Sequence, residues 1–197
     1  MQRVLDVFFS AVAIILLTPL LLPLMCILKI TGEAEVFYVQ TRIGRLGNEF
    51  GLLKFATMLK DSPKLGTGEI TIKNDPRVLP FGKFLRISKI NELPQLWNIL
   101  IGDMSIVGPR PMVPNTYAKY PKRAQEILNT VRPGLTGIAA IRFRDEERYL
   151  DGLEDPMCFY TKNLLPHKCD LEIWFVENNN IRLYFNLIFL TAWVVVF

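Results

Sequence analysis

The sequence predicts a mixed α/β (α+β) membrane-associated domain, and three observations support this prediction. Half of the 197 residues are hydrophobic and the mean hydropathy is +0.24, although 21% of the residues are charged. Two strongly apolar segments, residues 4–30 and 181–197, flank the chain. Between them, short β-type stretches alternate with amphipathic helical stretches. We therefore expect a membrane helix (1–31), a polar domain with its own core (32–176) and an apolar membrane-interface segment (177–197).

The charge and the rare residues restrict the chemistry. The net charge of +4 and the pI near 9.0 favour a phosphate-rich partner. The charge is modest and spread out, so a nucleic acid is not expected. Cys26, Cys158 and Cys169 stand far apart, and His167 is the single histidine, which makes a disulfide framework, a zinc site and histidine catalysis poor explanations. A metal would be a hard cation on carboxylate and phosphate oxygens, with Mg²⁺ the leading candidate.

The first apolar segment is long enough for a membrane helix of about 20 residues. Thr18-Pro19 lies near its middle and Pro23 follows one turn later. Proline removes a backbone donor and clashes with the preceding turn, so the helix should break or kink there. Two geometries are open: a helix that dips into one leaflet and returns, and a kinked span. A signal peptide explains the segment less well, because Asp6 is unusual in one and no cleavage site follows.

A hairpin is expected after this segment. Alternation in 35–40 marks one strand, 51–58 reads as a second, and Gly44 and Gly47 mark the turn between them. Lys54 is the only charge in the second strand. It either snorkels to water or binds an anionic ligand, and we favour the ligand.

A helix is predicted over 91–100. Asn91 is a strong N-cap type, Glu92 complements the helix dipole, and Pro94 is tolerated in the first turn. Leucines and Trp97 at helical spacing form a stripe to be buried, and the helix should stop at Gly102. Capping alone would be enough to explain the Asn91-Glu92 pair.

The basic residues near this helix argue for more than capping. A helix start is a ready anion site, and Arg86, Lys89 and Arg110 are close to it in sequence. Arginine matches phosphate in geometry. A carboxylate among arginines, here that of Glu92, can serve as a nucleophile, a metal ligand or a general base.

The second half of the chain predicts further elements. An amphipathic helix over 113–129 should break near Pro121. A Pro-Gly turn at 133–134 and Gly137 should lead into an apolar strand that ends at Arg142 and Arg144. A helix beginning at residue 170 should be interrupted by the asparagines at 178–180. The final apolar segment is short for a span and is better suited to lie in the membrane interface.

Taken together and in order, these pieces resemble the monotopic phosphoglycosyl transferases, the bacterial sugar transferase family. The matching pieces are the Pro-interrupted N-terminus, QTRIG (40–44), KFATM (54–58), DPR (75–77), FGKFLR (81–86), NELPQLWN (91–98), GDMSIVGPRP (102–111), RPGLTG (132–137) and the stretch 165–179. The combination covers nearly the whole chain and is highly specific.

The resemblance implies transfer of a sugar-1-phosphate from a UDP-sugar to polyprenyl (undecaprenyl) phosphate, with release of UMP. It implies Mg²⁺, a phosphosugar–enzyme intermediate, and a re-entrant helix that breaks at Thr18-Pro19. It further implies a place in the bacterial inner membrane with the catalytic domain on the cytoplasmic face. The oligomeric state is left open, with a homodimer among the options.

The resemblance also assigns site residues. The family opens this helix with an Asp-Glu dyad that holds the nucleophile and the metal, and the matching residues here are Asn91 and Glu92. Glu92 carries over directly, whereas an amide at Asn91 is neutral and poorly nucleophilic. The residues expected to contact phosphate and nucleotide are Lys54, Arg77, Arg86 and Arg110. Ala56 and Leu79 stand where the family commonly has Arg and Thr.

Four explanations of Asn91 are open. It is an engineered replacement of a nucleophilic Asp, a natural variant in which Glu92 acts as nucleophile or base, a residue that deamidates, or the mark of an inactive relative. We rank the natural variant first. Two other classes of function stay as alternatives: a substrate-binding or scaffold protein of the same pathway, and a single-span anchor for a basic binding domain.

Overall fold

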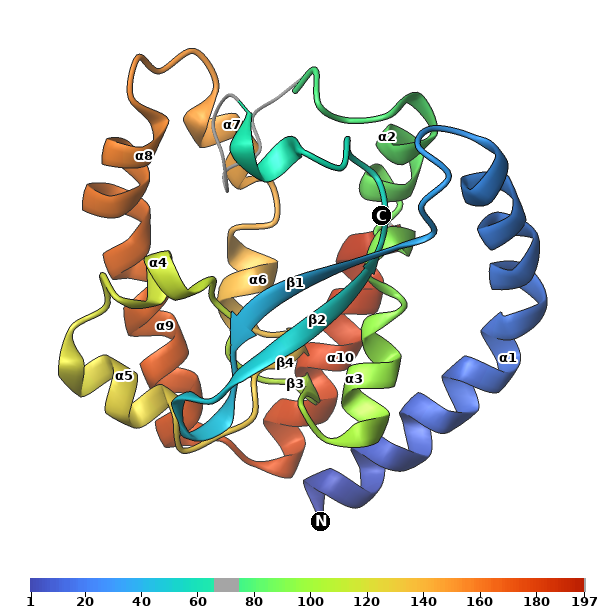
Figure 1. The fold of residues 1–197 in the computed structure, drawn as a ribbon. Helices are drawn as coiled ribbons and strands as arrows, with labels where there is room; N and C mark the ends of the chain where they lie inside the picture. Colours follow the sequence, from blue (N-terminus) through green and yellow to red (C-terminus); the bar gives the residue numbers. More distant parts are fainter. Residues whose placement is uncertain (66–74, 197) are drawn as a thin grey trace.

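Figure 1 shows the chain in a computed structural model that describes residues 1–65 and 75–196. Two small strand pairs, β1–β2 and β3–β4, lie at the centre. Helix α1 runs along one side, and other helices pack around the strand pairs. The predicted mixed α/β architecture with a long apolar N-terminal helix is confirmed. Phe197, the last residue of the predicted C-terminal segment, lies outside the described residues.

Helix α1 spans Gln2–Ile30 and stays helical through Pro19 and Pro23. The Thr18 hydroxyl donates to the carbonyl oxygen of Ile14 at 2.7 Å, a type of bond that bends helices, and Figure 1 shows that α1 changes direction along its course. The sequence predicts a break or a kink at this point, and the structure shows a continuous helix without a break.

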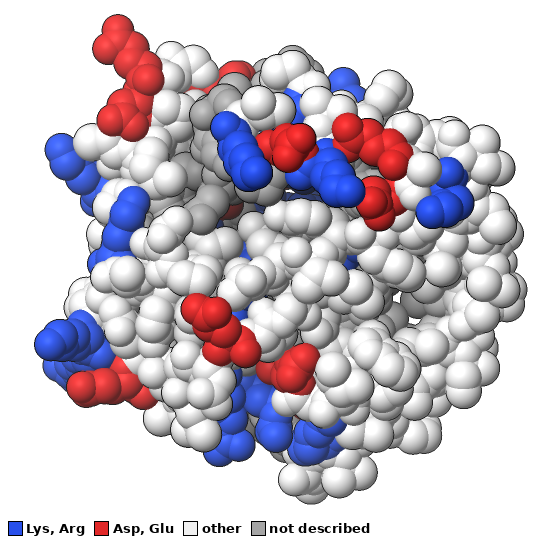
Figure 2. All heavy atoms as spheres, viewed as in Figure 1, with Lys and Arg blue, Asp and Glu red and all other residues white. Residues whose placement is uncertain are grey.

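Most apolar side chains of α1 face outward. Of its residues, only Asp6, Ser10, Leu24 and Leu28 are buried, and Figure 2 shows a largely uncharged surface on the side where α1 lies. Within the described ranges, α1 is the one helix long and apolar enough to cross a membrane. A long helix whose apolar side chains are mostly exposed fits association with a lipid bilayer.

The predicted hairpin is confirmed. Strands β1 (Phe37–Ile43) and β2 (Glu49–Phe55) pair antiparallel, and the short helix η1 (Arg45–Gly47) makes the turn. Gly47 takes the left-handed φ of 74° that this turn requires. The edge of β2 is completed by a side chain, because Asn98 accepts from the Leu53 N–H at 3.0 Å and donates to the Gly51 carbonyl at 2.8 Å.

Three short helical elements follow, and the last of them ends where the sequence predicts, just before Gly102. They are α2 (Pro80–Ile87), η3 (Ile90–Glu92) and α3 (Gln95–Ile101). Helix α3 ends at Ile101 and is capped by Gly102, whose φ of 107° only glycine adopts readily. The predicted helix over 91–100 is therefore present, but its first turn is a separate 3-10 turn.

Strands β3 (Ser105–Val107) and β4 (Gly134–Thr136) form a parallel pair. Their glycines allow close backbone contact: a Cβ added at Gly134 would lie 2.1 Å from the nitrogen of Gly108, and one at Gly137 would lie 2.2 Å from the Gly108 oxygen. The strand predicted after Gly137 is wrong. Residues Ile138–Arg142 form helix α6, because β4 comes before Gly137 and the alanine-containing segment after it packs as a helix on α9 and α10.

The other elements frame this centre. They are η2 (Ser62–Lys64), α4 (Pro114–Tyr117), α5 (Lys122–Leu128), α7 (Glu146–Leu150), α8 (Pro156–Phe159), the π-helical turn η4 (Tyr160–Leu164), α9 (Leu165–Asn178) and α10 (Ile181–Val196). The breaks predicted near Pro121 and at 178–180 are confirmed. One hydrophobic cluster lies under α9, and another joins α1, β2 and α2 through Leu24, Leu28, Phe55 and Leu85.

Candidate active site

The turn that carries Asn91 and Glu92 lies between α2 and α3. It follows Lys89, whose φ of 58° is uncommon for a residue with a side chain. Asn91 is 6% exposed, and its Oδ1 has no hydrogen-bond partner within the part of the chain that the structure describes. Asn91 makes no capping bond, so capping alone does not explain this residue. A buried oxygen without a partner is costly and is free to bind a ligand.

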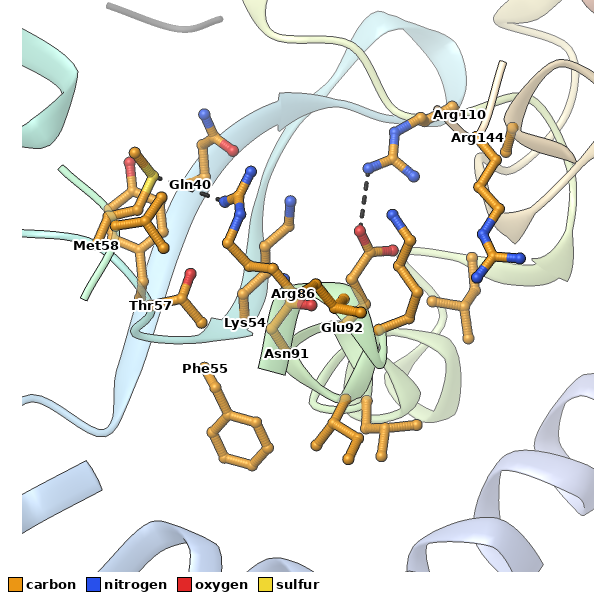
Figure 3. A pocket seen from close by; sticks show the side chains of 18 of the residues that line it. Gln40, Lys54, Phe55, Thr57, Met58, Arg86, Asn91, Glu92, Arg110 and Arg144 are labelled. Carbon is orange, nitrogen blue, oxygen red and sulfur yellow. Dashed lines mark hydrogen bonds and ion pairs between the residues drawn. The ribbon is translucent and has the colours of Figure 1, made fainter. Parts of the chain in front are cut away.

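Glu92 forms an ion pair with Arg110. Nη2 of Arg110 donates to Oε1 of Glu92 at 3.2 Å, as the dashed line in Figure 3 marks. Burial alone would raise the pKa of Glu92, but the charges of Arg110, Lys54 and Lys89 outweigh it and lower this pKa to about 2. The carboxylate is therefore ionised at neutral pH. It suits a nucleophile or a metal ligand better than a general base, whose pKa should lie near the working pH.

Lys54 extends from β2 toward the same centre (Figure 3). Burial is the main reason that its pKa is lowered to about 7; Arg42, Arg110 and Arg86 add to the effect, and Glu92 opposes it. Near neutral pH, Lys54 therefore exists in both protonation states. A bound phosphate would favour the charged form, as expected for the anion-binding role predicted from the sequence.

Two more arginines border the centre. Figure 3 places Arg86 of α2 and Arg144, which follows α6, on opposite sides of Glu92. Arg86 also donates to Sδ of Met58 at 3.6 Å. Sequence reasoning did not select Arg144 as a site residue, because it placed this side chain at the end of a strand. The available signal was a basic residue shortly after the second glycine turn.

Arg77 is buried apart from this centre and does not line the cavity around it. Its guanidinium donates to both carboxylate oxygens of Asp75, at 2.9 and 2.6 Å, and to the carbonyl oxygens of Ser62 and Leu65. These bonds tie together the turn at 75–77 and the η2 region. The predicted phosphate contact of Arg77 stays a prediction. Thr18 and Pro19 of α1 are likewise outside the cavity.

The centre opens into a cavity of about 1700 Å³. Around Glu92 the lining is mainly cationic, with Lys54, Arg86, Lys89, Arg110 and Arg144, whereas other parts of the lining carry the carboxylates Glu33, Glu35, Asp75, Asp145 and Glu146. One wall is apolar and comes from β3, β4, α6 and α10: Ile106, Leu135, Ala139, Ala140, Ile188 and Ala192. The cavity is therefore matched to ligands that combine several negative charges with an apolar part.

The donors fit a magnesium ion only with help from a substrate. The described residues contain no group of three or more His, Cys, Asp or Glu side chains that could hold a metal. Glu92 offers a carboxylate, and Asn91 offers the buried Oδ1 that lacks a partner. Mg²⁺ commonly binds one or two protein oxygens and completes its shell with substrate phosphates and water. The Asn91-Glu92 pair offers protein oxygens of this kind.

Comparison with known proteins gives the family. The sequence model of the family described as "Bacterial sugar transferase" matches residues 1–197. The chain is 38% identical over 162 residues to the exopolysaccharide production protein ExoY of Rhizobium meliloti, which covers 75% of this chain and 71% of that protein. It is 32% identical over 196 residues to the UDP-glucose:undecaprenyl-phosphate glucose-1-phosphate transferase of Klebsiella pneumoniae, which covers 97% of this chain and 39% of that protein.

A protein of the same transferase name in Caulobacter vibrioides is 40% identical over 145 residues, which covers 72% of this chain and 53% of that protein. The chain thus spans about half or less of the length of these two curated transferases, whose names state their substrates. The match to the family model nevertheless extends from the first residue to the last. This chain belongs to the bacterial sugar transferase family.

Proposed function

We propose that this chain transfers a sugar-1-phosphate from a UDP-sugar to polyprenyl phosphate and releases UMP. The observation that carries the proposal is an ionised carboxylate, Glu92, surrounded by cations in a cavity that also has an apolar wall. The cations suit the diphosphate of the donor and the phosphate of the acceptor. The names of the Klebsiella and Caulobacter relatives support both substrates.

Glu92 acts as the nucleophile in this proposal. One of its oxygens attacks the phosphorus that carries the sugar, and the bond from that phosphorus to the bridging oxygen breaks, so that UMP leaves with the electron pair. The sugar phosphate is then held as a mixed anhydride on Glu92. A phosphate oxygen of the acceptor attacks the same phosphorus, which forms the lipid diphosphate and restores the carboxylate. The low pKa of Glu92 supports nucleophilic attack over proton abstraction.

The cations have separate tasks. Arg110 neutralises Glu92 in the resting site through their ion pair and, with Lys54, Arg86 and Arg144, takes up the charge of the bound phosphates. Mg²⁺ would be held by Glu92 and Asn91 and would supply charge stabilisation for the diphosphate. The isoprenoid part of the acceptor would lie on the apolar wall formed by α6 and α10, because a nucleotide sugar has no comparable apolar surface.

Release of UMP tests the proposal directly. Purified chain with Mg²⁺ and undecaprenyl phosphate should release UMP from at least one member of a panel of UDP-sugars, and omission of the lipid should stop turnover. UDP-glucose is the first donor to try, since the curated relatives are named for it. If neither this chain nor Asn91→Asp released UMP from any donor, the proposed transfer would be wrong. UDP-sugar binding without turnover would favour the substrate-binding alternative.

The membrane geometry is the second part of the proposal: α1 enters and leaves the same face of an inner membrane, with the catalytic domain on the cytoplasmic side. Both ends of α1 pack on the same domain, which supports a re-entrant helix. Near its start, the Arg3 guanidinium donates to the Leu100 carbonyl at 2.9 Å and Gln2 donates to Ser105 at 3.0 Å. Near its end, Leu24 and Leu28 pack with Phe55 and Leu85.

Cysteine accessibility distinguishes the two geometries. In a chain without Cys26, Cys158 and Cys169, single cysteines at residues 2 and 31 should both react from the cytoplasmic side of sealed vesicles. The physical reason is that a helix anchored at both ends to one domain cannot place its ends on opposite faces. Labelling of the two positions from opposite sides would show a span instead. Exposed Glu126→Cys serves as the control for the side of the domain.

A further inference from the structure

The segment that delivers Arg110 to the site has little support of its own. It consists of β3, Gly108, Pro109 and Arg110, and within the described residues the strand partner of β3 is the three-residue strand β4. Short isolated strand pairs are marginally stable. Backbone bonds join it to the 133–136 segment along its length: the Ser105 N–H donates to the Pro133 oxygen (2.8 Å), the Gly108 N–H donates to the Thr136 oxygen (2.9 Å), and the Pro109 oxygen accepts from the Gly134 N–H (2.8 Å). Carboxyl groups from α1 and α9 add a further attachment at each of its two ends.

Glu172 of α9 holds the C-terminal end. Its side chain is 2% exposed, and Oε1 accepts the backbone N–H of Arg110 at 3.1 Å. Burial raises the pKa of Glu172 to about 7, although the Arg110 N–H and Lys168 lower it. Glu172 does not line the large cavity. In the described part of the chain, the one hydrogen bond of this buried carboxyl group goes to the backbone of Arg110, a residue of the site, and its Oε2 has no partner.

Asp6 of α1 holds the N-terminal end. It is 2% exposed, and Oδ1 accepts the Ile106 N–H at 3.0 Å and the Tyr184 hydroxyl at 2.9 Å. Oδ2 accepts the Ser105 hydroxyl at 2.9 Å. The same carboxylate thus joins α1, β3 and α10. Asp6 also lies outside the large cavity.

The prolines make these two attachments effective. Pro109 fixes its own φ, and Pro111 restricts the backbone of Arg110 to extended conformations. A segment with so few backbone conformations needs little more than fixed ends to define where the Arg110 side chain starts. The restricted backbone thus leaves few positions for the Arg110 side chain, whose Nη2 lies 3.2 Å from Oε1 of Glu92.

We propose that Glu172 and Asp6 are positioning residues that hold the two ends of the Ser105–Arg110 segment, so that Arg110 is set against Glu92 and the substrate phosphates. Neither carboxyl group touches substrate in this proposal. The expected loss of transfer rate rests on the proposed function. The expected loss of UDP affinity rests only on the position of Arg110. The proposal also connects α1 and α9 to the site.

A double-mutant cycle tests the proposal. Glu172→Met should lower kcat/KM for the UDP-sugar about tenfold to 100-fold, because the N–H of Arg110 loses its acceptor and the guanidinium moves. Glu172→Gln keeps an acceptor oxygen and should stay within about threefold of the parent. In an Arg110→Ala background, Glu172→Met should add less than about threefold, since coupled residues are not additive. Asp6→Ala should behave like Glu172→Met, and Asp6→Asn should behave like Glu172→Gln, both in the parent chain and in the Arg110→Ala background.

Cys169→Ala is the matched control, because Cys169 is buried on α9 one turn from Glu172 but belongs to the hydrophobic cluster. Its effect should be the same with and without Arg110. Thermal melting of every variant identifies any that fail to fold, and if Glu172→Met is one of them, the cycle of Asp6 with Arg110 decides the matter. The proposal is wrong if Glu172→Met costs as much without Arg110 as with it, or if Glu172→Gln costs as much as Glu172→Met.

The same cycle is measured on the affinity for UDP by calorimetry. This second readout separates the two hypotheses. If the parent chain binds UDP but transfers nothing, the proposed function fails; a coupled loss of UDP affinity in Glu172→Met would still support the positioning role. Additive losses of UDP affinity would overturn that role, whether or not the chain is active.

Discussion

Glu92→Gln is expected to lower kcat for sugar-phosphate transfer by at least about 10³-fold, with little loss of UDP affinity. Glutamine has nearly the same shape, and its oxygen can still accept from Arg110. It carries no charge, however, and its amide oxygen is a poor nucleophile. The measurement is UMP release with undecaprenyl phosphate, alongside calorimetric titration of UDP. Binding should persist, because the cations near Glu92 stay in place.

Glu126→Gln is the matched control, since Glu126 is an exposed carboxylate on α5 outside the cavity. It should leave both the rate and the affinity unchanged. Glu92→Gln should also form no covalent sugar-phosphate adduct when mixed with donor alone, whereas the parent chain should form one. A variant with normal kcat would remove Glu92 from the chemistry. A variant that forms the adduct but turns over slowly would assign Glu92 to the second step.

Local sequence patterns were enough to predict the elements that depend on near neighbours. The hairpin follows from alternation around Gly44 and Gly47, and the end of α3 follows from the left-handed Gly102. Such features depend on backbone preferences within a few residues. Lys54, Arg86, Glu92 and Arg110, which the motifs selected as site residues, all line one cavity, whereas Arg77, selected with them, does not. Their roles in binding and chemistry stay predictions.

Features set by distant contacts were beyond such reasoning. Helix α6 was predicted as a strand, because a short apolar run does not reveal whether it will pack as strand or helix. That error hid Arg144. Asn91 is a good capping type, yet its Oδ1 is buried without a partner in the described part of the chain, because the left-handed Lys89 starts a separate turn before α3. The N-cap preference of asparagine is a property of the residue type, and it does not predict the conformation of the turn in which Asn91 lies.

Arg110→Ala is expected to lower kcat/KM about 10²- to 10³-fold at neutral pH, the usual range for loss of one preorganised donor in a site. It should also change the pH profile. Burial favours the neutral form of Glu92, and Arg110 is the strongest of the charges that oppose it. Without Arg110, only the weaker influence of Lys54 and Lys89 remains, so the pKa of Glu92 must rise from about 2.

The sign of the pH effect follows from which form reacts. The ionised carboxylate is the nucleophile and predominates above its pKa, so a raised pKa moves the acidic limb of kcat/KM to higher pH. The parent chain should show no limb from Glu92 above pH 5, whereas Arg110→Ala should lose activity as the pH falls. Arg110→Lys keeps the positive charge but loses the bidentate hydrogen bonding of the guanidinium. It should therefore keep a pH profile closer to that of the parent chain than Arg110→Ala does, while it binds the donor less tightly than the parent chain. If Arg110→Ala instead kept the parent profile on a lower rate, Arg110 would serve the phosphates alone, and the low pKa of Glu92 would have to be maintained by Lys54 and Lys89.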